Sequence, residues 1–178
     1  MIGNNIALRA PEPADIEILY QWENDPRIWH LGNTLAPYSK FQIEQFVLNS
    51  TQDIYSSRQL RMMIDWIKTA PDVVTVGSVD LFDFDPHHRR AGVGIMIGDQ
   101  YRSKGFASEA LWLLSEYCFS TLNLHQLYCN IGSNNPESIR LFTRQGYKLC
   151  GRRKQWLFIN QKWCDEIMLQ KINPMEPL

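Results

Sequence analysis

The sequence has few features of a secreted, membrane-spanning or metal-binding protein. It has no CxxC pair and no Cys/His group at zinc-ligand spacing, so we expect free, mostly buried thiols and no metal site at its four separated cysteines, Cys118, Cys129, Cys150 and Cys164. No apolar run approaches the roughly 20 residues of a transmembrane helix, and no signal-peptide pattern is present. We therefore expect a cytoplasmic protein that makes no membrane contact.

An excess of charge of one sign is also missing. Lys and Arg number 18 against 19 Asp and Glu, which gives a formal net charge of −1. This balance argues against a nucleic-acid-binding surface and leaves a small cationic substrate possible. Repeats and low-complexity segments are absent, and 44% of the residues are hydrophobic, enough for one substantial core. We expect a single domain over residues 1–172 and a loose tail over residues 173–178.

Hydrophobic periodicity predicts an α+β fold. Short turns between successive strands predict mostly antiparallel neighbours. Helices are expected after Pro13, after a capping box at Ser39, from Ala107, and after Asn135 as N-cap with Pro136 at the first position. Strands are expected at residues 6–9, 59–68, 73–84, 93–97, 127–131, 148–159 and 162–170.

The stretch from Arg90 to Leu114 organises the chain. It contains a strand, a cationic turn, and a helix whose apolar period begins at Ala107. A helix N-terminus has unpaired N–H groups and a partial positive charge, both of which suit a phosphate group. Gly105 permits close backbone approach or a positive φ. The residues predict a site for a phosphorylated ligand, although an ordinary strand-to-helix connection with solvated cations would explain them equally.

Two motifs resemble those of the GNAT (GCN5-related) acetyltransferases. Arg102-x-x-Gly105-x-Ala107 is similar to the family's Q/R-x-x-G-x-G/A, and residues 135–147 are similar to its N-x-x-A-x-x-L-Y-x-x-x-G-F. The spacing of the two motifs also fits, and the likeness covers most of the chain. It is nearest to the spermidine and ribosomal-protein N-terminal acetyltransferase branches, the former through residues 123–128 and 158–160.

The resemblance implies a fold and a reaction. The fold is a single-domain GNAT fold, with a mixed, mostly antiparallel sheet, helices on both faces and splayed central strands. The reaction is acetyl transfer from acetyl-CoA to a primary amine, which attacks the thioester directly while both substrates are bound. A homo-oligomer is possible, since relatives often assemble. Splaying would open a slot for the cosubstrate, and Gly92, Gly94 and Gly98 are compatible either with a bulge there or with relief of packing crowding.

The resemblance also implies residues that bind acetyl-CoA. Main-chain groups of Ile95, Met96 and Ile97 would pair with the pantetheine arm, and one N–H would face the thioester carbonyl. Asn135 would bond the pantetheine arm, although its role as helix cap is equally supported. The pyrophosphate would be held mainly by main-chain amides of Arg102, Ser103, Lys104, Gly105, Phe106 and Ala107.

The sequence departs from the family at its catalytic acid and base. Phe142 stands where the family often has a tyrosine that protonates the thiolate, and Tyr147 occupies the usual core aromatic position. Gly92 stands where the spermidine branch has a glutamate. We retain Asp80, Asp83 and His88 as candidate bases, while Asp85 and His87 lie in the same region and each of these residues is also explained as a solvated strand or turn residue.

The acceptor is left open among a polyamine, a peptide N-terminus and an amino sugar or antibiotic. Residues 31–49 contain only Glu44 as an acidic residue, which weakens spermidine in particular. The loop with Trp29, His30, Leu35 and Tyr38 would line an acceptor pocket or simply pack. The spacing of acidic residues before this loop mostly predicts a solvated helix face, at Glu12, Asp15, Glu23 and Asp25. A non-catalytic acetyl-CoA sensor is the alternative function.

Overall fold

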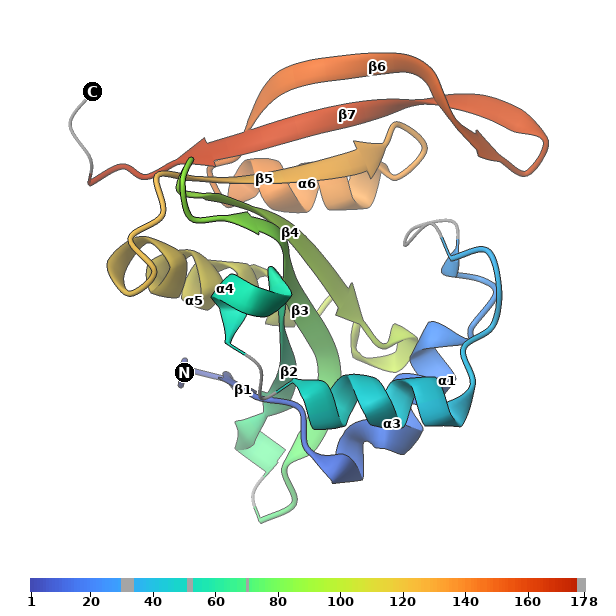
Figure 1. Cartoon of the computed structure of the whole chain (residues 1–178), viewed down its shortest axis with the longest axis vertical. Coiled ribbons are helices and arrows are strands. Elements are labelled where there is room, and N and C mark those ends of the chain that lie inside the picture. Colours follow the sequence, from blue (N-terminus) through green and yellow to red (C-terminus); the bar gives the residue numbers. More distant parts are fainter. Residues whose placement is uncertain (30–33, 51–52, 70, 176–178) are drawn as a thin grey trace.

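A single mixed sheet forms the centre of the molecule (Figure 1). The computed structural model describes residues 1–29, 34–50, 53–69 and 71–175. In this part of the chain the strand order is β1-β2-β3-β4-β5-β7-β6, and every neighbouring pair is antiparallel except β4 with β5. The strands are β1 (Ile6–Arg9), β2 (Leu60–Trp66), β3 (Val74–Asp85), β4 (Arg90–Ile97), β5 (Gln126–Gly132), β6 (Lys148–Ile159) and β7 (Lys162–Ile172). The predicted mixed, mostly antiparallel sheet is confirmed.

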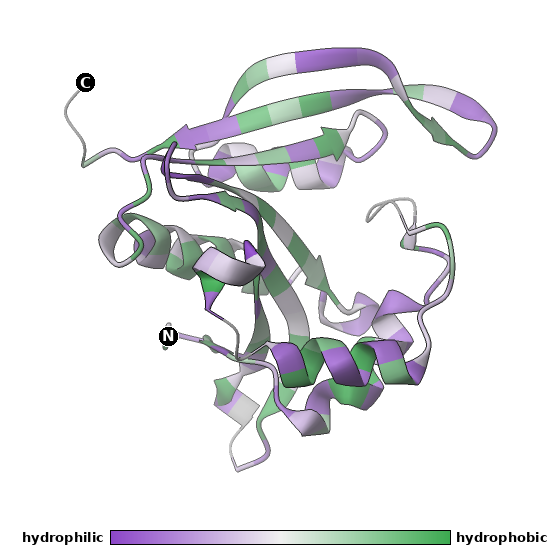
Figure 2. Cartoon of the chain, in the orientation of Figure 1, coloured by the Kyte–Doolittle hydropathy of each residue, from purple (hydrophilic) through white to green (hydrophobic). Residues whose placement is uncertain are grey.

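Helices cover both faces of this sheet, as expected. Met63 of β2 is fully buried against α1 and α3, whereas its neighbours Met62 and Ile64 point into the core beneath α5 and α6, because successive strand residues face opposite sides. Figure 2 shows hydrophobic and hydrophilic residues alternating around α3. The helices are α1 (Ile16–Glu23), α3 (Lys40–Asn49), α4 (Ile54–Ser57), α5 (Phe106–Ser120) and α6 (Pro136–Arg144), with 3-10 turns η1 (Pro13–Asp15), η2 (Ile67–Thr69) and η3 (Asp99–Tyr101).

Several local predictions hold because short-range chemistry decides them. Ser39 accepts from the Gln42 N–H at 3.1 Å, which completes the expected capping box before α3. Gly146 follows α6 with φ +87°. Asn160 and Gln161 both have positive φ in the β6–β7 turn, the backbone that a two-residue hairpin loop favours.

The C-terminal segment is fixed to the fold at its first residue. Asn173, the first residue of the segment expected to be loose, is buried, and its N–H donates to the His125 carbonyl at 2.8 Å.

Of the cysteines, Cys118 and Cys129 are buried, whereas Cys150 is exposed. Within the described ranges, no helix combines the length and apolar character needed to cross a bilayer.

The central strands β4 and β5 splay, as expected. Their parallel pairing includes only three positions and ends at Gly92 opposite Tyr128. Beyond this point β4 continues to Ile97 and β5 to Gly132, so the strands diverge (Figure 1). Divergence leaves one edge of β4 without a strand neighbour in the middle of the sheet.

The irregularity beside the splay lies in β3 and not at the β4 glycines. The β3–β4 register shifts between Phe82 and Asp85, and Asp83 has φ +48°, so the extra residue of a bulge belongs to β3. Gly92 instead makes room for a ring, because a Cβ there would lie 2.2 Å from Cε2 of Phe82. Of the two explanations for Gly92, relief of crowding is therefore correct.

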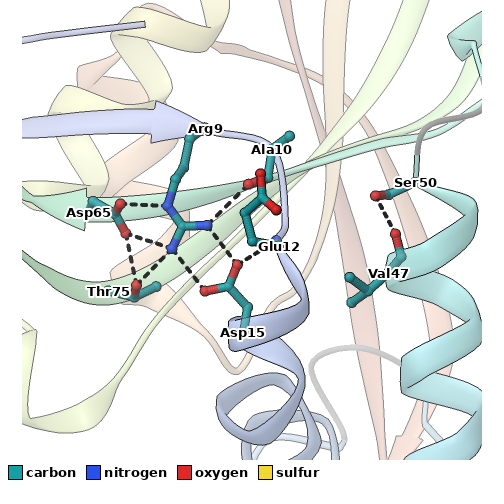
Figure 3. A network of polar contacts seen from close by, with 8 residues as sticks. All are labelled: Arg9, Ala10, Glu12, Asp15, Val47, Ser50, Asp65 and Thr75. Carbon is teal, nitrogen blue, oxygen red and sulfur yellow. Dashed lines mark hydrogen bonds and ion pairs between the residues drawn. The ribbon is translucent and has the colours of Figure 1, made fainter.

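A polar network fixes the start of α1 against the sheet (Figure 3). Arg9 donates through Nη1 and Nη2 to both carboxylate oxygens of Asp15, at 2.6 and 2.8 Å, and through Nε to Asp65 at 2.6 Å. Thr75 donates to Asp65 at 2.8 Å, and the Glu12 N–H donates to Asp15 at 2.7 Å. The network joins β1, β2, β3 and the turn before α1. Asp15 is buried, which corrects its interpretation as part of a solvated face.

This network predicts a loss of stability in acid. Burial would raise the pKa of Asp15, but the Arg9 hydrogen bond and the Glu12 N–H outweigh it and hold the pKa below its ordinary 3.8. The stabilisation is therefore complete above about pH 4 and is lost as the pH falls through the lowered pKa. We expect Asp15→Asn to remove this part of the pH dependence. Urea unfolding of both proteins between pH 7 and 3 measures it, and parallel pH profiles would contradict it.

Candidate active site

A cleft of about 1100 Å³ opens where β4 and β5 separate. Its walls come from both sides of the sheet: the start of α5 and the length of α6 on one side, and the end of α1 on the other. Of the residues expected to bind acetyl-CoA, the structure brings together at this cleft Ile95, Met96, Ile97, Arg102, Ser103, Gly105, Phe106, Ala107 and Asn135.

Free main-chain donors surround the turn before α5. Ser103 and Gly105 have φ of +62° and +84°, and the first helical hydrogen bond runs from the Glu109 N–H to the Gly105 carbonyl at 3.1 Å. Within the described part of the chain, the N–H groups of residues 103–108 have no hydrogen-bond acceptor. Apart from Gly105 itself and its two chain neighbours, no heavy atom lies within 4 Å of the position a Gly105 Cβ would take. The turn therefore offers an open cluster of donors that fits an anion.

Arginines supply the positive charge around this turn. Arg102 pairs with Asp99 at 3.0 Å and donates through Nε to the Ile97 carbonyl at 3.4 Å. Arg140 and Arg144 of α6 line the same end of the cleft. Lys104 does not line it: its Nζ lies 5.0 Å from the ring centroid of Trp66. Of the two cations in this turn, Arg102 therefore lines the cleft.

The free edge of β4 presents alternate main-chain groups to the cleft. The Gly98 N–H donates to the Val76 carbonyl at 2.9 Å, so the main chain at Gly98 points to β3. Because these groups alternate along an antiparallel strand, Met96 also points to β3, whereas Ile95 and Ile97 point to the gap left by β5.

Asn135 has capacity for two roles. Its Oδ1 accepts from the Ser138 N–H at 3.1 Å, which confirms it as the cap of α6. Among the described residues no acceptor lies at its Nδ2, which remains able to donate into the cleft. The cap and a pantetheine contact are thus compatible, because they use different atoms.

The far end of the cleft carries two carboxylates joined by one guanidinium. Arg61 of β2 donates to Glu23 at 2.5 Å through Nη1, and to Asp80 at 2.6 Å through Nε. Burial raises the pKa of Asp80 and Arg61 opposes it, with a net rise. Burial would lower the pKa of Arg61, but the two carboxylates raise it above its ordinary value. Trp22 and Trp29 line the cleft beside this cluster.

Other residues considered as catalytic lie away from the cleft. Asp83 accepts from the Tyr128 hydroxyl at 3.1 Å, and His88 lies in the β3–β4 turn with its ring 4.6 Å from that of His87. Phe142 is only 3% exposed and packs edge-on against Tyr147 at 5.0 Å. These side chains do not line the cleft, and neither do Leu35, which is 95% exposed, or Tyr38. His30 lies outside the described residues.

Glu23 and Arg61 are residues of the cleft that the sequence motifs do not identify. The spacing of acidic residues predicts a solvated helix face at Glu23, yet Glu23 lines the cleft at the end of α1. The sequence does mark Arg61 as a candidate site residue, because it is a charged residue within a strand whose alternate positions are apolar. The missing information was the register, which places Arg61 directly opposite Asp80.

Comparisons with known proteins agree with this geometry. A family model described as an acetyltransferase (GNAT) domain matches residues 5–148. Spermidine N(1)-acetyltransferase of Escherichia coli K12 is 26% identical over 167 residues, which cover 94% of this chain and 86% of that protein. The Vibrio cholerae enzyme of the same name is 25% identical over 164 residues, covering 92% and 91%.

A solved structure extends the agreement to three dimensions. Spermidine N-acetyltransferase from Vibrio cholerae, in complex with CoA and spermine, superposes with a TM-score of 0.82 at 25% identity, over 96% of each chain. The match of the family model covers most of the chain, and the splayed sheet of that fold is present. The chain belongs to the GNAT acetyltransferase family and is an acetyl-CoA-dependent N-acetyltransferase.

Proposed function

We propose that the two ends of the cleft bind the two substrates of this reaction, with acetyl-CoA at the α5 end. The open N–H groups of residues 103–108 would take the pyrophosphate, and Arg102, Arg140 and Arg144 would add charge. Arg102 would exchange its contact with Asp99 for a phosphate oxygen. The cosubstrate supplies the activated acetyl group, and this end of the cleft orients it.

The free edge of β4 would align the acyl arm. The Ile95 and Ile97 main chains point into the gap, so they are the groups that would pair with pantetheine amides. One of these N–H groups would also donate to the thioester carbonyl, where negative charge develops during attack. Met96 would contribute only its side chain, because its main-chain N–H and C=O face β3.

The acceptor that suits the far end is a cationic alkylamine of the polyamine class. Two carboxylates, Glu23 and Asp80, face one guanidinium there, which leaves a local excess of negative charge. Trp22 and Trp29 provide aromatic surface, on which alkylammonium groups bind favourably. Support also comes from the named substrate of the relatives, spermidine. The carboxylate pair across the sheet from the donor turn is the observation that carries this proposal.

Thiol release from acetyl-CoA with different amines tests the acceptor class. We expect steady turnover with spermidine and spermine, and kcat/KM values at least about tenfold lower for a peptide N-terminus or an aminoglycoside, because these present less charge along a narrow chain. The matched control is N-acetylated spermidine, which lacks one charge. A preference for the peptide or the amino sugar would contradict the proposed class. Tight CoA binding with no turnover on any amine would favour a sensor.

A further inference from the structure

Gly92 stands where the spermidine branch has a glutamate, and the Phe82 ring occupies the space beside it. A Cβ at Gly92 would lie 2.2 and 2.5 Å from Cε2 and Cζ of Phe82. The aromatic ring thus takes the space beside β4 in which a longer side chain at position 92 would stand. A carboxylate at position 92 would require Phe82 to move, so the acidic groups of the acceptor site come from other elements of the fold.

Asp80 is a carboxylate of the neighbouring strand that lies beside β4 and lines the cleft. It lies two residues before Phe82 on β3 and pairs in register with Gly94 of β4. A Cβ at Gly94 would meet only Cβ of Asp80 and Cε1 of Phe82, each at 3.9 Å, so β4 places no side chain between Asp80 and the cleft. Both Asp80 and Gly94 line the cleft.

We propose that Asp80 receives the proton released by the acceptor ammonium, and that Arg61 is a positioning residue that holds Asp80 and Glu23 in place. This inference rests on the proposed function. The amine nitrogen loses two protons as its bond to the acetyl carbon forms and the carbon–sulfur bond breaks. One proton passes to the Asp80 carboxylate and then to water, and the other leaves with the thiolate as the free thiol. Protons and charge therefore balance without another reactant.

The surroundings of Asp80 suit this role. The charged groups that face it are Arg61 from β2 and Glu23 from α1, while β4 contributes the uncharged Gly94 and Met96 among the described residues. Burial raises the pKa of Asp80, which brings a carboxylate closer to the range useful for proton transfer. Cζ of Arg61 also lies 5.0 Å from the centroid of the Phe46 ring, and this packing restricts the orientation of the guanidinium.

Asp80→Asn in the full chain tests the proton acceptor, with acetyl-CoA and spermidine as substrates. We expect kcat to fall about 100-fold or more, the size typical of lost acid–base catalysis, and the acidic limb of the pH profile to disappear. Coenzyme A affinity, measured by calorimetry, should stay within about twofold and shows that the fold persists. Asp80→Glu should retain part of the rate.

Asp83→Asn is the matched control, because Asp83 lies on the same strand outside the cleft. Its φ of +48° is a backbone conformation that asparagine tolerates well. We expect its kcat and pH profile to match those of the unchanged protein. If Asp80→Asn keeps both its kcat and the acidic limb, Asp80 is not the proton acceptor.

Arg61→Lys tests the positioning role. A lysine cannot bridge two carboxylates as a planar fork does, so KM for spermidine should rise. The acidic limb should also move to higher pH, because the Asp80 anion loses part of its stabilisation. A lower rate with an unmoved limb would contradict this role. If another amine is the substrate, the same variants are measured with it; a protein that acetylates no amine overturns both this inference and the proposed function.

Discussion

Replacing Gly105 by aspartate is expected to weaken the binding of coenzyme A by about 100-fold. Apart from Gly105 and its chain neighbours, no heavy atom lies within 4 Å of the place that a Cβ would take, so a new side chain meets open space at the donor turn. A unit charge about 5 Å from a phosphate costs roughly 3 kcal/mol at an effective dielectric constant near 20, which is more than a factor of about 100 in affinity. Calorimetric titration with coenzyme A measures the change.

Gly105→Asn is the control for this substitution. Asparagine has the same shape as aspartate and tolerates the φ of +84°, but it carries no charge. We expect its affinity to stay within about tenfold of the original, so that the difference between the two variants reports the charge alone. Equal affinities for the two variants would contradict a phosphate site at this turn. Thermal unfolding should be similar for both, which separates binding from folding.

Replacing Arg9 by methionine is expected to lower the stability of the protein by about 2–4 kcal/mol. Asp15 and Asp65 are largely buried and would each lose their cation, and breaking a buried ion pair costs about 3–5 kcal/mol. The Arg9 side chain is 33% exposed, so we place the cost somewhat lower. At about 2–4 °C per kcal/mol for a chain of this size, the melting temperature should fall by roughly 5–15 °C.

Lys40→Met is the matched control for the Arg9 variant. The Lys40–Glu17 pair has a similar distance, 2.8 Å, but both side chains are more than half exposed. Exposed ion pairs contribute little to stability because solvent screens them, so the melting temperature should change by only a few degrees. Scanning calorimetry of both variants measures the difference. Equal shifts would show that the Arg9 network is as weak as an exposed pair.

The Arg9 network also links stability to the site. It fixes the beginning of α1, and the last residue of that helix is Glu23, which reaches the cleft and accepts from Arg61. Loosening the start of α1 should therefore disturb the acceptor end more than the α5 end. We expect Arg9→Met to raise KM for the amine while the affinity for coenzyme A changes little.

Local chemistry made much of the fold predictable from the sequence. The cap at Ser39, the cap at Asn135, the positive φ at Gly146 and the hairpin turn at residues 160–161 depend on a few neighbouring residues each. The strands were predictable because apolar side chains alternate along them. The donor turn was predictable because the cationic, glycine-containing turn and the helix after it are contiguous in the chain.

The sequence by itself therefore determined the elements, their caps and the donor turn, together with the motifs that mark the family. Only the tertiary structure decided that Arg61 bridges Glu23 and Asp80, that Phe82 occupies the space over Gly92, and which β4 groups face the gap. The physical reason is register: a shift of one residue between strands exchanges the two faces of a sheet, and no local pattern fixes which distant side chains then meet.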